Sequence, residues 1–183
     1  MNYLLIGDSK EMKQTKLNFT FFMKKIIILT FLVVLSFFAF GQPIASWKMS
    51  SLEEHITKSE NPVIINFWAT YCLPCIEEIP YFQELTKKYE ENGVKLLLVS
   101  LDFKEAYPEK IRKFSNKMKF TAPIVWLDET DADYFCPRID SAWSGVMPAT
   151  LFVNNKTGFR SFYEEQMSKE RLEKEIIKMI GEL

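Results

Sequence analysis

The chain has 183 residues, a length that favours one domain or at most two small ones. Apolar residues make up 48% and charged residues 26%, a globular balance that argues against disorder. A formal net charge of -1 excludes the basic excess of a nucleic-acid-binding protein. Three cysteines are too few for a disulfide-stapled scaffold, and a single histidine, His55, argues against His-rich metal sites and most catalytic triads.

The first part of the chain has the three parts of a secretory signal. Lys24 and Lys25 precede an almost wholly apolar run, residues 26–40, and small residues stand at Ala39 and Gly41. The run is shorter than the roughly 20 residues that a membrane-spanning helix needs. We therefore expect cleavage after Gly41.

This pattern predicts two parts: residues 1–41 as a leader with a signal peptide, whose natural start is Met23, and residues 42–183 as one domain. The alternatives are an uncleaved membrane anchor, because tilt can stretch a short segment, and a buried core helix. A signal or an anchor places the domain in the periplasm or elsewhere outside the cytoplasmic membrane. Contact with the membrane is then expected only through an uncleaved leader.

Helices and strands alternate along the predicted domain. Apolar runs predict strands at Val63–Phe67, Val94–Leu101, Ile124–Leu127, Ala149–Val153 and Phe159–Tyr163, the last two joined by a hairpin turn. Helices are predicted at Leu52–Lys58 behind a Ser51/Glu54 capping box, at 72–91 with a kink at Pro80, after Pro108, and after a Ser168 cap. This order predicts an α/β fold with helices on both faces of a central sheet.

The sequence Cys72-Leu73-Pro74-Cys75 follows a predicted buried strand and begins a helix. By spacing alone the pair permits a redox dithiol, half of a zinc site or a structural bridge. The amino end of a helix stabilises a thiolate through its free N–H groups and its dipole. We therefore expect Cys72, at the exposed helix tip, to be the nucleophile, and Cys75, one turn further, to be the resolving thiol.

Two clusters carry a family resemblance: residues 66–75 (NFWATYCLPC) with Glu78 and Pro80, and residues 147–150 (MPAT). In these residues the sequence resembles the thioredoxin superfamily, and within it the TlpA/ResA-like periplasmic thiol–disulfide oxidoreductases. The resemblance implies a thioredoxin-like fold with a mixed sheet, a redox-active disulfide, export, no cofactor and a cis proline at Pro148. It also implies a TlpA-type strand–helix insertion, which we expect within residues 94–122.

The resemblance assigns a further catalytic residue. Plain thioredoxins keep a buried Asp on the strand before the motif, whereas this chain has Asn66, which cannot accept and return a proton. TlpA/ResA-like proteins often place a Glu one turn after the second cysteine, and Glu78 matches that position on the same helical face as Cys75. Glu78 is therefore a candidate proton acceptor for Cys75, the alternative being a solvated helix carboxylate.

Substrate binding is assigned by the same resemblance to Trp68, Met147 and Pro148. The backbone before Pro148 is expected to pair with an extended client segment, while Trp68 packs beneath the disulfide. Trp143 is interpreted as a packing residue, the alternative being contact with substrate. Gly145 is interpreted as the residue that gives the loop before Pro148 its unusual dihedral angles.

The third cysteine, Cys136, permits a zinc set together with Cys72, Cys75 and His55. His55 has no ligand spacing to any of them, and a lone Cys is more often a small, partly buried apolar residue. We therefore expect no metal, and a position for His55 at the surface or at its boundary with the core.

Together these observations predict an exported protein-disulfide reductase that serves cell redox homeostasis. Its expected partners are exported protein thiols and disulfides as substrates and a membrane thiol-transfer protein as electron donor. Apocytochrome c thiols are one client class at the family level, with a role in cytochrome c maturation. The alternatives are a dithiol oxidase of the same fold and a non-catalytic or metal-handling module.

Overall fold

The computed structural model describes residues 19, 21–27, 30 and 43–182. The chain divides into two units, Met1–Gly41 and Gln42–Leu183. In the first unit, residues 21–27 are helical, whereas most of the predicted apolar run and the cleavage point after Gly41 lie outside the described residues. The leader therefore stays a prediction. Within the described segments, no helix is both long and apolar enough to cross a membrane.

The second unit alternates strands and helices, as the sequence predicted. Its strands are β1 (Ala45–Trp47), β2 (Val63–Trp68), β3 (Lys95–Ser100), β4 (Ile124–Leu127), β5 (Ala149–Asn154) and β6 (Phe159–Tyr163). Its α-helices are α2 (Met49–Lys58), α3 (Leu73–Lys88), α4 (Glu109–Lys117), α5 (Ala132–Ile139) and α6 (Lys169–Ile180), with short 3-10 helices η1 (Glu90–Asn92) and η2 (Lys104–Ala106).

The strands form one mixed sheet in the order β1-β4-β3-β2-β5-β6. The first four are parallel to one another, and β5 and β6 are antiparallel to their neighbours. Trp68 at the end of β2 lies opposite Ser100 at the end of β3, and Phe67 lies opposite Ala149 at the start of β5. Three connecting loops therefore meet at one edge of the sheet.

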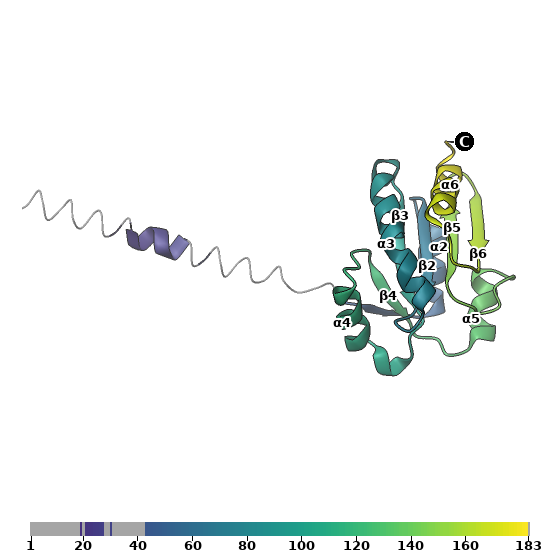
Figure 1. Ribbon diagram of the computed structural model, residues 1–183, viewed down its shortest axis with the longest axis horizontal. Coiled ribbons are helices and arrows are strands. Elements are labelled where there is room, and N and C mark those ends of the chain that lie inside the picture. The colour runs from purple at the N-terminus through teal and green to yellow at the C-terminus, as the bar shows by residue number, and fades with distance from the viewer. Residues whose placement is uncertain (1–18, 20, 28–29, 31–42, 183) are drawn as a thin grey trace, which may run out of the picture. The chain divides into compact units, whose positions relative to one another are not determined.

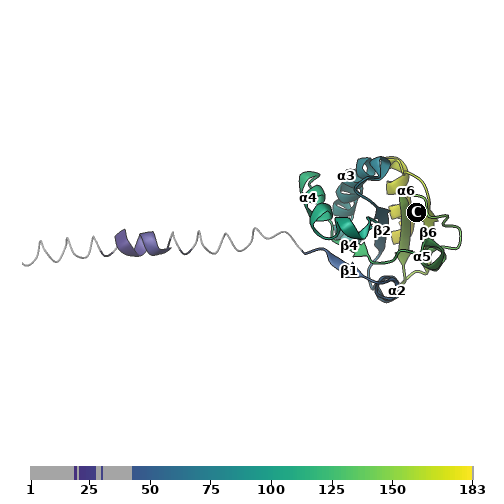
Figure 2. The same cartoon turned by 90° about the horizontal axis from the view of Figure 1, so that it is seen from below.

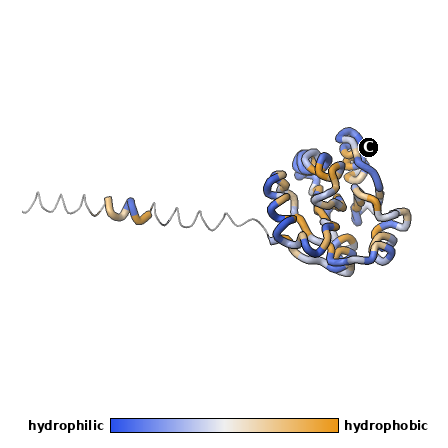
Figure 3. Tube along the Cα trace, turned by 60° about the horizontal axis from the view of Figure 1, so that its bottom comes forward, coloured by the Kyte–Doolittle hydropathy of each residue, from blue (hydrophilic) through white to orange (hydrophobic). Residues whose placement is uncertain are grey.

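Helices cover both faces of this sheet, which confirms the predicted fold class. Helices α3, α4 and α6 lie on one face, and α2 and α5 lie on the other (Figures 1 and 2). Strand β2 is buried along its whole length, with Ile64 and Trp68 in the first core layer and Ile65 and Phe67 in the second. A strand covered on both faces is an unbroken apolar run. Hydrophobic stretches accordingly gather among the strands (Figure 3).

Of two predicted helix caps, one is wrong and one is confirmed. Helix α2 begins at Met49, three residues before the predicted start, so Ser51 lies inside the helix and the capping box is wrong. The backbone N–H of Met49 instead donates to Glu129 Oε1 at 2.9 Å, so a carboxylate distant in sequence satisfies the helix end. The predicted Ser168 cap is confirmed, because its hydroxyl accepts from the N–H of Arg171 at 3.3 Å.

Two elements were missed and one boundary was misplaced. Strand β1 has only three residues, and helix α5 contains Pro137, so neither has a clear sequence signal. The insertion was expected within residues 94–122, and that range does include helix α4. The strand that follows it, β4, lies just outside, and it separates β1 from β3 in the sheet.

Candidate active site

The two motif cysteines stand at the amino end of helix α3, and they are joined by a disulfide with their Cα atoms 5.3 Å apart. Cys72 is the N-cap residue, and its carbonyl accepts from the N–H of Ile76 at 3.1 Å. Cys72 keeps 8% of its surface exposed, whereas Cys75 keeps none. The helix end and its dipole favour a thiolate here, and Cys72 is the more exposed of the two cysteines.

A buried carboxylate fixes the loop that leads into Cys72. Asp102, beyond the end of β3, accepts hydrogen bonds from the backbone N–H of Thr70 at 3.1 and 3.2 Å and from the Thr70 hydroxyl. The Ser100 hydroxyl also donates to Asp102, at 2.8 Å. The loop after β2 is therefore tied to the end of β3. The sequence analysis missed Asp102, although an acidic residue directly after a buried apolar strand is a usable signal.

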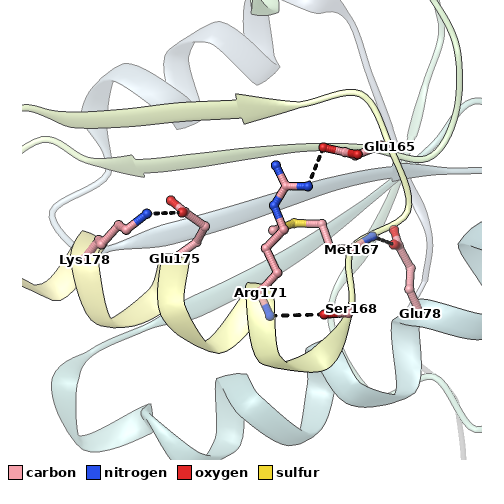
Figure 4. A network of polar contacts seen from close by, with 7 residues as sticks. All are labelled: Glu78, Glu165, Met167, Ser168, Arg171, Glu175 and Lys178. Atoms are coloured by element: carbon pink, nitrogen blue, oxygen red, sulfur yellow. Dashed lines mark hydrogen bonds and ion pairs between the residues drawn. The ribbon is translucent and has the colours of Figure 1, made fainter.

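Glu78 is fully buried one turn after Cys75, so a solvated helix carboxylate is the wrong description. Its Oε1 accepts from the side-chain amide of Asn66 at 2.7 Å. Its Oε2 accepts from the backbone N–H of Met167 at 3.0 Å, a contact drawn in Figure 4. Burial raises the pKa of Glu78 to about 7, against the opposing effect of these two hydrogen bonds. A carboxyl with this pKa can both take and return a proton near neutral pH.

The bond between Met147 and Pro148 is cis, as expected. Pro148 is buried and Met147 is half-buried, directly before strand β5. Because β5 begins opposite the end of β2, this loop lies beside the segment that leads into Cys72. The structure thus brings the two predicted clusters together at one edge of the sheet.

The loop before Pro148 is shaped by two residues that the sequence singled out. Gly145 has a φ of 93°, a conformation that side chains rarely adopt, as predicted. Trp143 is buried against Phe67 with ring centroids 4.5 Å apart, and its Nε1 donates to the carbonyl of Val146 at 3.0 Å. Trp143 is therefore a packing residue.

Trp68 is fully buried in the same core layer as the two cysteines. Its ring makes an edge contact with Phe120, with centroids 5.3 Å apart, and lies 6.2 Å from Phe114. It has no exposed surface, so any effect on a substrate passes through the residues that it supports.

Exposed apolar side chains lie at the same edge of the sheet as the disulfide. Four of the exposed large apolar residues, between 56% and 71% exposed, belong to the three loops at this edge or to the start of α3: Tyr71, Leu73, Phe103 and Val146. The rings of Tyr71 and Phe103 stack with centroids 5.7 Å apart. We call these four residues the apolar rim. Such a concentration of exposed apolar side chains is typical of a binding surface. Tyr71 and Leu73 belong to the motif that the sequence singled out, whereas Phe103 and Val146 carry no motif and were missed.

Cys136 and His55 lie away from this site. Cys136, on α5, packs in the core layer on the opposite face of the sheet from the disulfide. Burial, with smaller contributions from Glu164 and Asp133, raises the pKa of its thiol to about 11. His55 is half-buried beside Trp47, with ring centroids 5.3 Å apart. The structure does not bring these two residues to Cys72 and Cys75.

A buried strand that leads into a helix headed by two cysteines, facing a cis-proline loop on an antiparallel strand, defines a thioredoxin-like protein. The sequence profile of the AhpC/TSA family matches residues 33–158, and the chain belongs to this family.

Curated relatives agree with this placement. The chain is 32% identical over 111 residues to the thiol-disulfide oxidoreductase ResA of Oceanobacillus iheyensis, a match that covers 61% of this chain and 53% of the relative. It is 30% identical over 137 residues to the thioredoxin-like protein YneN of Bacillus subtilis, covering 72% and 71%. The matches thus span only 53% and 60% of the ResA proteins of O. iheyensis and Geobacillus kaustophilus.

Solved structures show the same fold. StoA from Bacillus subtilis superposes with a TM-score of 0.50 at 26% identity, covering 65% of this chain and 84% of that one. A thioredoxin-related protein from Neisseria meningitidis serogroup B superposes with a TM-score of 0.56 at 22% identity, covering 68% and 88%.

Proposed function

We propose that this protein is an exported thiol–disulfide oxidoreductase whose reduced Cys72–Cys75 pair reduces disulfides of other exported proteins. The observation that carries the proposal is the cysteine pair at the amino end of α3, where Cys72 retains some exposed surface and Cys75 has none. The activity printed in the names of the ResA relatives supports it.

Reduction of a client proceeds by two exchanges. The Cys72 thiolate attacks one sulfur of the client disulfide, that bond breaks, and the departing client thiolate takes up a proton. The Cys75 thiolate then attacks Cys72 in the mixed disulfide, which closes the disulfide within the protein and releases the second client thiol. Two electrons and two protons pass to the client, and the protein ends in the disulfide form that the structure holds.

The second exchange needs a group that removes the proton from Cys75. Glu78 lies three residues on in the same helix and is buried with it. Residues three apart are neighbours on a helix surface. A carboxyl whose pKa is about 7 is matched to this task at neutral pH, so we assign Glu78 as the proton acceptor.

Client binding is assigned to the cis-proline loop and the apolar rim. The backbone at Met147, before buried Pro148, is positioned to add an extended client segment by strand pairing. The exposed side chains of the rim offer apolar contacts at the same edge of the sheet. An unfolded segment with apolar residues near its cysteines fits this arrangement.

Export supplies the setting for this chemistry. The leader pattern of residues 1–41 supports an extracytoplasmic location, where disulfides persist and a reductase has substrates. A membrane thiol-transfer protein would then regenerate the dithiol. Apocytochrome c thiols are one client class, with cytochrome c maturation as the corresponding process.

Trapping and turnover assays test the proposal. Cys75→Ser should accumulate clients linked through Cys72 in the exported fraction, and Cys72→Ser should trap none and lose insulin reduction. Cys136→Ser is the matched control and should retain turnover. Equal trapping by both motif variants, or no insulin reduction by the reduced wild-type protein, would contradict the proposal. Net oxidation of reduced clients by the disulfide form would favour the dithiol oxidase.

A further inference from the structure

The side-chain nitrogen of Asn66 has two hydrogen-bond partners among the described residues, whereas the side-chain oxygen has none. Its side-chain nitrogen donates to Glu78 Oε1 at 2.7 Å and to Thr150 Oγ1 at 3.1 Å. Its side-chain oxygen is buried and has no hydrogen-bond donor among the described residues. All three residues are fully buried. Because a buried polar atom without a partner is costly, this one calls for an explanation.

The arrangement suits only an ionised Glu78. Met167 presents a backbone N–H to Oε2, and that N–H cannot become an acceptor. A proton on Glu78 is therefore best placed on Oε1. In the present orientation the O–H would then face the N–H of Asn66, two donors opposed at 2.7 Å. Protonation of Glu78 is then strongly disfavoured unless the side-chain amide of Asn66 changes its orientation.

Rotation of the Asn66 amide by half a turn resolves the conflict. Its oxygen would then accept from the Glu78 O–H, and the Thr150 hydroxyl, which can donate as well as accept, would reverse its own hydrogen bond. Asn66 keeps two hydrogen bonds in both orientations, through its nitrogen with the carboxylate and through its oxygen with the acid. After inversion the NH₂ group stands where the oxygen is now, a position at which the described residues place no donor. Neither the Glu78 carboxyl nor the Met167 backbone needs to move.

We propose that Asn66 is a positioning residue for the proton on Glu78: its amide donates to the carboxylate and inverts to accept from the carboxylic acid. The inversion itself is a property of the buried network. Its consequence for turnover rests on the proposed function, in which Glu78 takes the proton of Cys75. Asn66 would then let Glu78 hold this proton without losing its bond to Met167.

Other titratable groups near Glu78 come from several elements. On α3 these are Cys75, exposed Glu77 and Tyr81, whose hydroxyl donates to the carbonyl of Met167. The carboxylate of Glu77 accepts from Gln166, in the loop before α6, and Glu170 lies on α6 itself. In the oxidised protein Cys75 does not titrate, so that form isolates Glu78 from the thiols.

The test is a pH titration of oxidised, isotope-labelled protein by NMR. We expect the Asn66 side-chain NH₂ signals to change with the same midpoint as the Glu78 carboxyl carbon. Nuclear Overhauser effects from this NH₂ group to Thr150 should be strong above the midpoint and weak below it. Buried Asn154 is the matched control, because Lys156 N–H and the carbonyl of Met179 fix both ends of its amide.

The same NMR titration of the Glu78→Gln variant provides a second test. The Gln amide can accept from Met167 and donate to an inverted Asn66, so the Asn66 signals should show the low-pH pattern at every pH. Unchanged Overhauser effects across the wild-type titration would overturn the inversion. A pH response of Asn66 that persists in Glu78→Gln would also overturn it, because the response would then have another source.

Asn66→Leu distinguishes an inverting amide from a fixed donor. If Asn66 serves both protonation states, its loss should change the acid dissociation constant of Glu78 less than threefold. A donor that helps only the carboxylate would instead give a decrease of tenfold or more on removal. These readouts use the protein without a client, so they can fail while insulin reduction succeeds, and the reverse also holds.

Discussion

Glu164 holds the loop before the cis proline through Ser144. One carboxylate oxygen accepts from the Ser144 hydroxyl at 2.6 Å, from its backbone N–H at 3.0 Å, and from the N–H of Val146 at 2.7 Å. Burial opposes ionisation of this carboxyl, but these hydrogen bonds outweigh it and lower the pKa of Glu164. The Glu164 carboxyl is therefore ionised at neutral pH, and its hydrogen bonds fix the backbone that leads to Met147.

Glu164→Ala should impair client binding more than thiol chemistry. Without the Glu164 carboxylate the loop loses three charge-assisted hydrogen bonds, so the backbone expected to pair with a client is less well ordered. We expect KM for a protein client to rise several-fold, while the rate with a small aromatic disulfide stays within about twofold. Glu165→Ala is the control, because this exposed neighbour pairs with Arg171 instead. Equal losses with both substrates would argue against a binding role.

Glu78 should make stability fall as the pH rises. In the unfolded chain this carboxyl ionises near its ordinary pKa of 4.5, whereas in the native protein its pKa is about 7. Burial of Glu78 therefore costs nothing below pH 4.5, and the full cost, about 3 kcal/mol, is reached above pH 7. In oxidised Glu78→Gln, the free energy of unfolding measured in urea should lack the decrease that Glu78 causes between pH 4.5 and 7. The exposed Glu77→Gln variant should retain it, and the same slope in both variants would refute the assignment.

The apolar rim should contribute to client affinity. Phe103→Ser removes an exposed ring that stacks on Tyr71, and the loss of about 50 Å² of buried apolar contact corresponds to roughly tenfold in kcat/KM. The measurement compares insulin with a short cysteine-containing peptide that lacks apolar residues, for which little change is expected. Tyr134→Ser, an exposed aromatic on α5, should leave both rates unaltered. An equal effect of the two substitutions would show that the rim has no special part.

Cys136 should be inert in the folded protein. Its pKa of about 11 keeps the thiol protonated at neutral pH, and it is buried in the core layer opposite the disulfide. Iodoacetamide should therefore modify Cys72 of the reduced native protein first and Cys136 only on unfolding. Mass spectrometry of timed samples measures this order. Rapid alkylation of Cys136 at neutral pH would contradict the assignment.

Local signals were sufficient for much of the fold. Strands β4 and β6 begin and end at the predicted residues, because each is a short apolar or aromatic run between turn residues. The start of α2 failed for the opposite reason. Its cap comes from Glu129, a residue 80 positions away that only the folded sheet brings to Met49.

The site divides in the same way. The Cys72–Cys75 disulfide and the cis bond before Pro148 were predicted, because short motifs encode them. The partners of Glu78 were not found, because Met167 contributes only a backbone N–H and Asn66 had been judged by the proton that it cannot carry. Hydrogen bonds between residues distant in sequence, such as those from Ser144 to Glu164, leave no local sequence pattern, because they form only in the folded protein.

The redox potential of the pair should lie at the reducing end. Strongly oxidising relatives stabilise the reduced thiolate through residues between the cysteines, whereas Leu73 and Pro74 supply no charge and no side-chain donor. Helix-end stabilisation of Cys72 then acts without further help, so we expect a potential nearer thioredoxin, at roughly -270 mV, than DsbA, at roughly -120 mV. Leu73 is exposed beside Cys72, so Leu73→His should introduce an imidazolium that stabilises the thiolate and raises the potential. Equilibration with a glutathione series and counting of free thiols measures both values, with Leu73→Gln as the uncharged control. A wild-type potential near the DsbA value would overturn the reductase assignment, while leaving Cys72 as the nucleophile.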